Sequence, residues 1–208
     1  MVSTRRTPRQ ERSRATRDAI LEAAARVFAE VGLERATTAR IAEVAGVSPG
    51  SMYQYFPSKD ALISALFTRE AEEGFRMFGA IAAELGTTDA PRLIRALVAC
   101  MVDQLESKLE LNRVLLEEVP RVTGLGQSRA VDRVVANAVQ LLLEAGKDRM
   151  QARDLEIAAM LVVRTFRYNI IPLLSEPVTG KKREAFIDEL SELIGVYLLA
   201  PRPWRQAE

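Results

Sequence analysis

The hydrophobic residues of this chain recur every three or four positions, the spacing that places them on one face of an α-helix. Between Thr16 and Val31, for example, Ile20, Val27 and Phe28 share one face, and Gly32 ends the pattern. No stretch shows the alternating pattern of a β-strand. We therefore predict an all-α protein, with helices at about 16–31, 38–45, from 49, 59–84, 93–105, 111–119, 131–143, 155–174 and 186–199.

Two of these helices are short and lie close together between residues 38 and 59. Gly46 follows the first helix, where a residue that tolerates positive φ is common. Thr38 can cap that helix, Ser48 can cap the second, and Pro49 stands at a first helical position that needs no N–H. The two helices share an apolar seam of Ile41, Ala42, Ala45, Val47 and Met52. This pattern is typical of a helix-turn-helix, whose second helix lies in the major groove of DNA.

A longer motif surrounds the turn. From Thr37 it reads Thr-Thr-x-x-Ile-Ala-x-x-Ala-Gly-Val-Ser-x-Gly-x-Met-Tyr-x-Tyr-Phe-x-Ser-Lys-x-x-Leu, which resembles the TetR/AcrR family of transcriptional regulators over about residues 14–67. The resemblance implies an N-terminal three-helix DNA-binding domain and a C-terminal helical domain for ligand binding and dimerisation. The expected divisions are a basic flexible arm at 1–13, a DNA-binding domain at 14–60, an effector and dimerisation domain at 61–200 and a tail at 201–208.

The resemblance also implies which residues meet a DNA operator. Short polar groups near the start of a recognition helix read base edges, whereas hydroxyls and cations hold phosphates. Carried over to this chain, base contacts fall on Pro49, Gly50, Ser51 and Gln54, a base or phosphate contact on Tyr53, and backbone contacts on Thr38, Tyr55 and Lys59, with Ser48 at the cap.

At two positions the DNA contacts implied by the resemblance are uncertain or missing in this chain. Residue 39 is alanine, where some relatives carry a long basic side chain that reads a base. Arg40 is either a substitute for that contact or a solvated surface charge. Phe56 is expected to close the small core rather than to meet DNA.

Charge is distributed unevenly along the 208 residues, although the net charge is only +1. Residues 1–60 carry ten lysines and arginines against seven acids, a net charge of +3, which leaves −2 for the rest. A basic first part suits a module that faces DNA. The arginine-rich residues 1–13 are either a loose tail or an arm that lies along the minor groove or the phosphates.

The reactive residue types are scarce. There is no histidine, and the single Cys100 lies in an apolar run typical of a buried thiol. Adjacent acids such as Glu117 and Glu118 do not share a helix face, so they do not form a catalytic pair. We predict no metal, cofactor or catalytic site. An all-helical ligand-binding or interaction protein, or an enzyme that uses the helix-turn-helix only structurally, remains the alternative.

Location follows from hydropathy. The N-terminus lacks the apolar core of a signal peptide, and the longest strictly apolar run, Ile157–Val163, is too short to cross a bilayer. We expect a cytoplasmic protein without a membrane partner.

The last two helices carry apolar residues on two sides, whereas a surface helix of a monomer needs one stripe. Ile157, Leu161 and Tyr168, for instance, form a second stripe on the first of them. We therefore expect a homodimer in which both helices pair with their copies. The expected interface residues are Val162, Phe166, Leu190, Leu193 and Tyr197.

The region between about residues 61 and 175 is rich in methionine and aromatic residues, which by themselves indicate only a core. Together with the family resemblance they predict a cavity for an apolar small molecule. Its expected lining is Phe75, Phe78, Met101, Met160 and Phe166, with Asn137, Gln140, Arg164 and Arg167 as polar candidates to orient the ligand.

Overall fold

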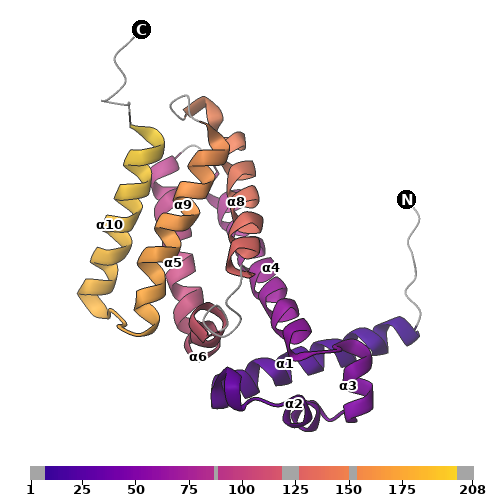
Figure 1. Ribbon diagram of the computed structural model, residues 1–208. Coiled ribbons are helices and arrows are strands. Elements are labelled where there is room, and N and C mark those ends of the chain that lie inside the picture. The colour runs from indigo at the N-terminus through magenta and orange to yellow at the C-terminus, as the bar shows by residue number, and fades with distance from the viewer. Residues whose placement is uncertain (1–7, 87–88, 119–126, 150–153, 201–208) are drawn as a thin grey trace, which may run out of the picture. The chain divides into compact units, whose positions relative to one another are not determined.

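The structure is a computed structural model that describes residues 8–86, 89–118, 127–149 and 154–200. Throughout these residues every regular element is a helix, which confirms the all-α prediction (Figure 1). The chain divides into two compact units, and the division does not follow the sequence. The first unit takes residues 1–69 together with 110–123, and the second takes 70–109 together with 124–208.

The first unit is built on α1 (Pro8–Arg35), α2 (Thr38–Ala45), α3 (Pro49–Tyr55) and the first part of α4 (Lys59–Leu85). The short α6 (Leu109–Arg113) and the π-helix η1 (Val114–Glu118) follow much later in the chain, and η1 packs on α1. All of them contribute to one apolar core, which includes Ile20, Val27, Phe28, Ile41, Met52, Leu62, Leu66, Leu111, Val114 and Leu115.

Two expected boundaries of this unit were wrong. Residues 8–13 are not a loose arm, because they form the beginning of α1; residues 1–7 lie outside the described residues. The unit also does not end at residue 60, because it includes α4 up to Arg69 and a second segment that begins at Glu110. The second difference arises because buried apolar residues, rather than proximity in the sequence, decide which segments pack together.

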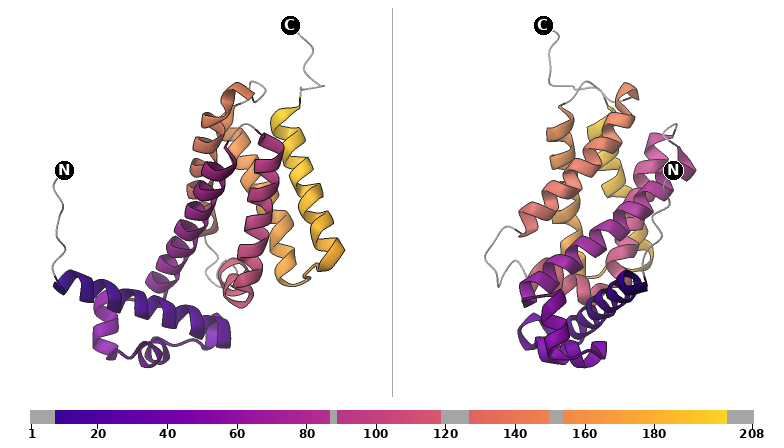
Figure 2. Two further views of the ribbon diagram at one scale, coloured as in Figure 1. Left: turned by 180° about the vertical axis from the view of Figure 1, so that it is seen from behind. Right: turned by 90° about the vertical axis from the view of Figure 1, so that its right-hand side faces the viewer.

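The second unit contains the rest of α4, α5 (Ala90–Ser107), α8 (Gln127–Ala145), α9 (Leu155–Ile170) and α10 (Gly180–Leu199). Short 3-10 helices, η2 (Lys147–Arg149) and η3 (Ile171–Leu174), lie after α8 and α9. The helix α9 packs against both α8 and α10, and α10 packs against α5 (Figure 2). A single helix was expected from 155 to 174, but α9 ends at Ile170 and the 3-10 helix η3 follows. Pro172 explains this change, because a proline cannot donate the backbone hydrogen bond that would continue an α-helix.

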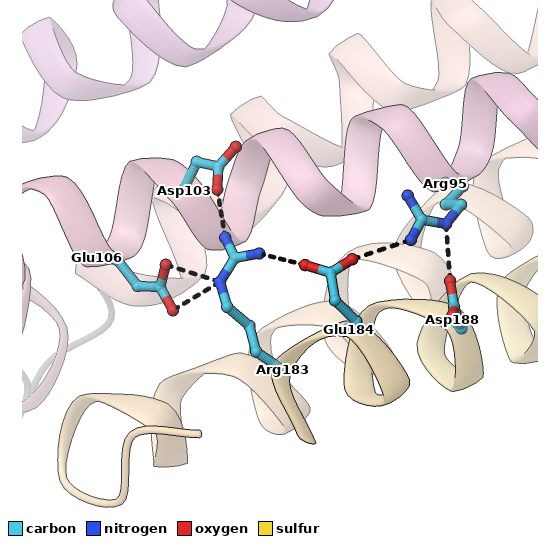
Figure 3. Close-up of polar contacts among 6 residues, drawn as sticks. All are labelled: Arg95, Asp103, Glu106, Arg183, Glu184 and Asp188. Carbon is cyan, nitrogen blue, oxygen red and sulfur yellow. Dashed lines mark hydrogen bonds and ion pairs between the residues drawn. The ribbon is translucent and has the colours of Figure 1, made fainter. Parts of the chain in front are cut away.

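Ionic contacts join α5 to α10 (Figure 3). The Arg183 guanidinium of α10 donates to Glu106 of α5 through Nε at 3.0 Å, and to Asp103 of α5 through Nη2. Its Nη1 donates to Glu184 at 3.1 Å. The Arg183 side chain is only 21% exposed, so these contacts are partly shielded from water.

A second arginine completes the network from the opposite helix. Arg95 of α5 donates to Asp188 at 2.7 Å and to Glu184 at 3.1 Å, both on α10. The hydrogen bond to Asp188 is the main reason that the pKa of Arg95 is raised, and the bond to Glu106 does the same for the pKa of Arg183. A raised arginine pKa keeps the charge at every pH below the ordinary value, so the arginines lose this stabilisation only in strong base.

Lys108 links the end of α5 to α4 within the same unit. Its Nζ donates to Glu70 and to Glu73, at 2.7 Å each. Burial alone would lower the pKa of Lys108, but the two hydrogen bonds outweigh it and the pKa is raised. The Glu70 side chain is 16% exposed, so removing the lysine would leave a largely buried carboxylate without this charge.

The segment Leu155–Leu174 is long and apolar enough to cross a membrane by length and composition alone, with a mean hydropathy of 1.4. Core helices of soluble proteins pass the same test, and this segment packs against two other helices of its unit. Its hydropathy is therefore weak evidence for a membrane span.

Candidate nucleic-acid interface

The turn between α2 and α3 has the predicted geometry. Gly46 ends α2 with φ 67° and ψ 30°, a left-handed conformation that other residues adopt only at a cost. The amide of Val47 donates to the carbonyl of Ala42 at 3.0 Å, which closes the turn. Ser48 then caps α3, because its side chain accepts from the amide of Ser51 at 3.1 Å. The predicted cap and stop are both confirmed.

The helix α3 turns one side inward and leaves the other side exposed. Met52 is fully buried, and Phe56, just after the helix, is 3% exposed. Phe56 is thus a core residue, as predicted, and the Arg17 guanidinium lies over its ring at 5.4 Å from the centroid. The opposite side of α3 carries the residues expected to read DNA. Pro49, Gly50, Tyr53 and Gln54 are exposed, and Ser51 and Tyr55 are half-buried.

The structure corrects the cap of α2. Thr37, not Thr38, is the capping residue, and its hydroxyl accepts from the amide of Arg40 at 3.2 Å. The hydroxyl of Thr38 instead lies 3.0 Å from that of Tyr53, so this pair joins α2 to α3 on the exposed side. Two consecutive threonines made the register of the cap ambiguous in the sequence, and the backbone conformation decides it.

Two cations expected at DNA have partners within the protein. Arg40 forms an ion pair with Glu30 at 3.2 Å, and both side chains are about half exposed, at 49% and 50%. This arrangement favours the interpretation of Arg40 as a solvated surface charge. The ammonium of Lys59 donates to the backbone carbonyl of Leu33, so in this structure Lys59 holds the end of α1.

The residues expected around a ligand differ in burial. Phe78 and Phe166 are buried, at 9% and 7% exposed, whereas Phe75, Met101, Met160 and Arg167 are half-buried. Asn137 and Arg164 are exposed, and their role in orienting a ligand stays a prediction. Gln140 is half-buried and donates to Glu144 of its own helix at 3.0 Å.

The expected dimer residues also separate into two groups. Phe166 and Leu190 are 7% and 5% exposed within a single chain, which corrects the expectation that they face a partner. Val162 and Tyr197 are half-buried, and Leu193 is 55% exposed. The large apolar side chains that α9 and α10 expose are Ile157, Leu161, Tyr168, Leu193 and Val196.

Cys100 is a buried thiol without a disulfide. Burial raises its pKa, so the reactive thiolate is scarce at neutral pH. The thiol therefore packs as a small apolar group, as the sequence indicated.

Comparison with known proteins agrees with this geometry. The family model described as bacterial regulatory proteins, tetR family, matches residues 20–66. A second model, described as a tetracyclin repressor-like C-terminal domain, matches residues 89–198, which is more than half of the chain. The chain therefore belongs to the TetR family of bacterial regulatory proteins. This family consists of transcriptional regulators, which are soluble DNA-binding proteins and generally not enzymes.

Curated relatives match part of the chain. The HTH-type transcriptional regulator UidR of Escherichia coli is 36% identical over 69 residues, which are 33% of this chain and 35% of that protein. An HTH-type transcriptional repressor of Mycobacterium tuberculosis is 36% identical over 101 residues, 49% of this chain and 51% of that protein. The chain thus matches about half or less of the length of these relatives.

Solved structures share the fold across most of the chain. The fatty acid degradation regulator FadR of Bacillus halodurans has a TM-score of 0.69 at 24% identity, covering 92% of this chain and 96% of that one. A TetR-family transcriptional regulator of Pectobacterium atrosepticum has a TM-score of 0.70 at 20% identity, covering 95% and 100%.

The corrected cap leads to a testable difference between two neighbouring threonines. Replacing Thr37 by valine keeps the shape but removes the cap of α2, so the free energy of unfolding should fall by about 1 kcal/mol. Replacing Thr38 by valine removes only an exposed contact to Tyr53 and should cost less than about 0.5 kcal/mol. Urea unfolding of both variants measures the difference. Equal losses, or a larger loss for Thr38→Val, would contradict the assignment.

Proposed function

We propose that this protein is a sequence-specific, double-stranded DNA-binding transcriptional repressor that a small apolar molecule releases from its operator. The observation that supports the DNA-binding part most directly is the position of α3. Buried Met52 anchors the helix, while small and polar residues at its N-terminal end face outward. A recognition helix reads base edges from that end.

The exposed residues of α3 suit different tasks at DNA. Gly50 and Ser51 are small, so the helix can approach base edges closely. Gln54 is exposed, and its amide can pair with the N6 and N7 positions of adenine. The hydroxyl pair of Thr38 and Tyr53 lies beside these groups and can contact a phosphate.

The first experiment compares Gln54 with Arg40. A duplex selected from a random library serves as the operator, and a scrambled duplex measures nonspecific binding. Gln54→Ala should lose about 1–3 kcal/mol on the selected duplex and little on the scrambled one, because a base contact disappears. Arg40→Ala, the control, should leave the ratio of the two affinities unchanged, because Arg40 pairs with Glu30. If Gln54→Ala weakens both duplexes equally, Gln54 does not read sequence.

A homodimer is the second part of the proposal, and exposed apolar residues support it. On α9, Ile157, Leu161 and Tyr168 fall on one stripe, since they are four and seven residues apart. On α10, Leu193 and Val196 are 55% and 57% exposed. Covering these surfaces calls for an interface of about 2,000 Å² in total. A two-fold dimer then implies a near-palindromic operator with half-sites in successive major grooves.

Sedimentation velocity tests the dimer. The wild-type protein should sediment as a dimer at micromolar concentration, and Leu193→Glu should yield monomers that bind the operator weakly, because a charge enters the interface. Ala80→Glu on α4 adds the same charge at another exposed position and should remain dimeric. A monomeric wild-type protein would overturn this part of the proposal.

The effector is the third part, and it rests on the family together with the composition of the second unit. In this unit Met101 and Met160 are half-buried, and Phe78 and Phe166 are buried. Flexible methionines and aromatic rings suit an apolar ligand. Arg167, which is half-buried, is the polar residue that best suits a role in orienting it.

A thermal-shift screen of hydrophobic compounds tests the effector, with an operator titration for every compound that raises the melting temperature. Linkage is reciprocal, so a compound that lowers operator affinity tenfold must itself bind the operator complex tenfold less well, about 1.4 kcal/mol. Compounds that stabilise the protein but leave operator affinity unchanged would contradict release by a ligand.

The cytoplasm is the proposed location, since the operator of a bacterial regulator lies there. The alternative of an enzyme or interaction protein with a purely structural helix-turn-helix leads to a different outcome of the selection. Such a protein would enrich no duplex sequence from the random library.

A further inference from the structure

The end of α1 contains an interruption that sets the start of α2. At Gly32, φ is 74° and ψ is 171°, so the backbone leaves the helical path for one residue. A new turn begins there, and the amide of Ala36 donates to the carbonyl of Gly32 at 3.3 Å. The extended ψ turns the amide of Leu33 away from the helical ladder of α1. This amide needs a partner from elsewhere, because Leu33 is only 3% exposed.

Glu118 supplies that partner from the C-terminal end of η1. Its Oε2 accepts from the amide of Leu33 at 2.8 Å, across 85 positions of sequence, in a part-buried contact. Glycine suits position 32 because its φ of 74° is strained for any other residue, whereas a Cβ there would meet Oε2 of Glu118 only at an ordinary contact distance of 3.4 Å. A bond from an amide to a charged carboxylate is roughly twice as strong as a neutral one.

The same residue is held on its other side. Lys59, at the start of α4, donates to the carbonyl of Leu33. Both peptide groups of Leu33 therefore have side-chain partners, and the two partners come from different helices. Leu33 and Ala36 are both buried in this turn. Thr37 caps α2 directly after Ala36, and Ala39, three residues after Ala36, already lies within that helix.

We propose that Glu118 is a positioning residue for operator binding. By holding the amide of Leu33, it fixes the turn that joins α1 to α2, and with it the direction in which α2 and α3 leave α1. Glu118 acts through Leu33, without touching DNA. This inference rests on the proposed DNA-binding function, and it adds to the DNA-binding unit a residue far outside the helix-turn-helix segment.

The direction in which DNA affinity changes when Glu118 is replaced distinguishes a positioning role from a simple charge effect. An acid in a DNA-binding unit repels phosphate, so removal of its charge alone should strengthen DNA binding. Loss of the bond to Leu33 should instead weaken binding, because the turn loses its restraint. Glu118→Ala removes both the charge and the acceptor, whereas Glu118→Gln removes the charge but keeps an oxygen that can accept from the amide.

Glu110 offers a matched control on the neighbouring helix α6. It forms an ion pair with Arg113 at 2.6 Å, and this exposed i,i+3 pair contributes little. Glu110→Ala and Glu110→Gln therefore report the effect of losing one acid from the same segment without touching the turn.

The experiment measures affinity for the selected operator at several salt concentrations. Relative to Glu110→Ala, Glu118→Ala should bind about five- to thirtyfold more weakly, the effect of losing a hydrogen bond to a charged group. The slope of log affinity against log salt should stay unchanged, because no phosphate contact is lost. Glu118→Gln should bind only about two- to fivefold more weakly than Glu110→Gln, a partial rescue that a nonspecific charge effect would not produce.

A second measurement on the wild-type protein keeps the proposal falsifiable if Glu118→Ala does not fold. The bond predicts slow hydrogen exchange at the amide of Leu33, at a rate similar to its neighbours in the core of the unit. Fast exchange there would overturn the proposal. So would operator affinity of Glu118→Ala equal to that of Glu110→Ala, or a loss in Glu118→Gln as large as in Glu118→Ala. If the wild-type protein itself shows no preference for the selected duplex over the scrambled one, the DNA-binding proposal fails, whereas a defect confined to Glu118 variants concerns only the positioning role.

Discussion

The two helices of the helix-turn-helix, α2 and α3, are too short to be stable on their own, and this constraint governs the first unit. α2 has eight residues and α3 has seven, whereas isolated helices need about 12–15 residues to be even marginally stable in water. Their geometry must therefore come from packing. Ile41 and Met52 are completely buried in a core built with α1 and α4. The outward direction of α3 is thus a consequence of what its inner side buries.

The same core explains why a distant segment belongs to this unit. Leu111, Val114 and Leu115 are buried in it, although α5 separates them from the helix-turn-helix in the sequence. Once these residues are packed, Glu118 lies at the amide of Leu33. Apolar burial brings the segment to its place, and the directional hydrogen bond then fixes one backbone group of the turn.

The second unit combines a buried apolar face with charges at its margin. α10 buries Ile187 and Ile194, while its neighbours Arg183 and Asp188 contact acids and an arginine of α5. Exposed ion pairs contribute little individually, so the buried apolar residues of α10 stabilise this contact more than the charges do. The apolar residues left outside, such as Leu193, are the surface that the proposed dimer would cover.

The sequence by itself determined the features that depend on local chemistry. The period of the apolar residues gave an all-α fold, and Gly46 and Ser48 marked the turn because left-handed backbone and capping hydroxyls are local requirements. The tertiary structure alone decided which of two equivalent threonines caps α2, which apolar side of α10 faces inward, and that Glu118 reaches Leu33. These depend on distances between segments far apart in the chain, which no local pattern encodes, because a side chain's partner is chosen by packing of the whole core.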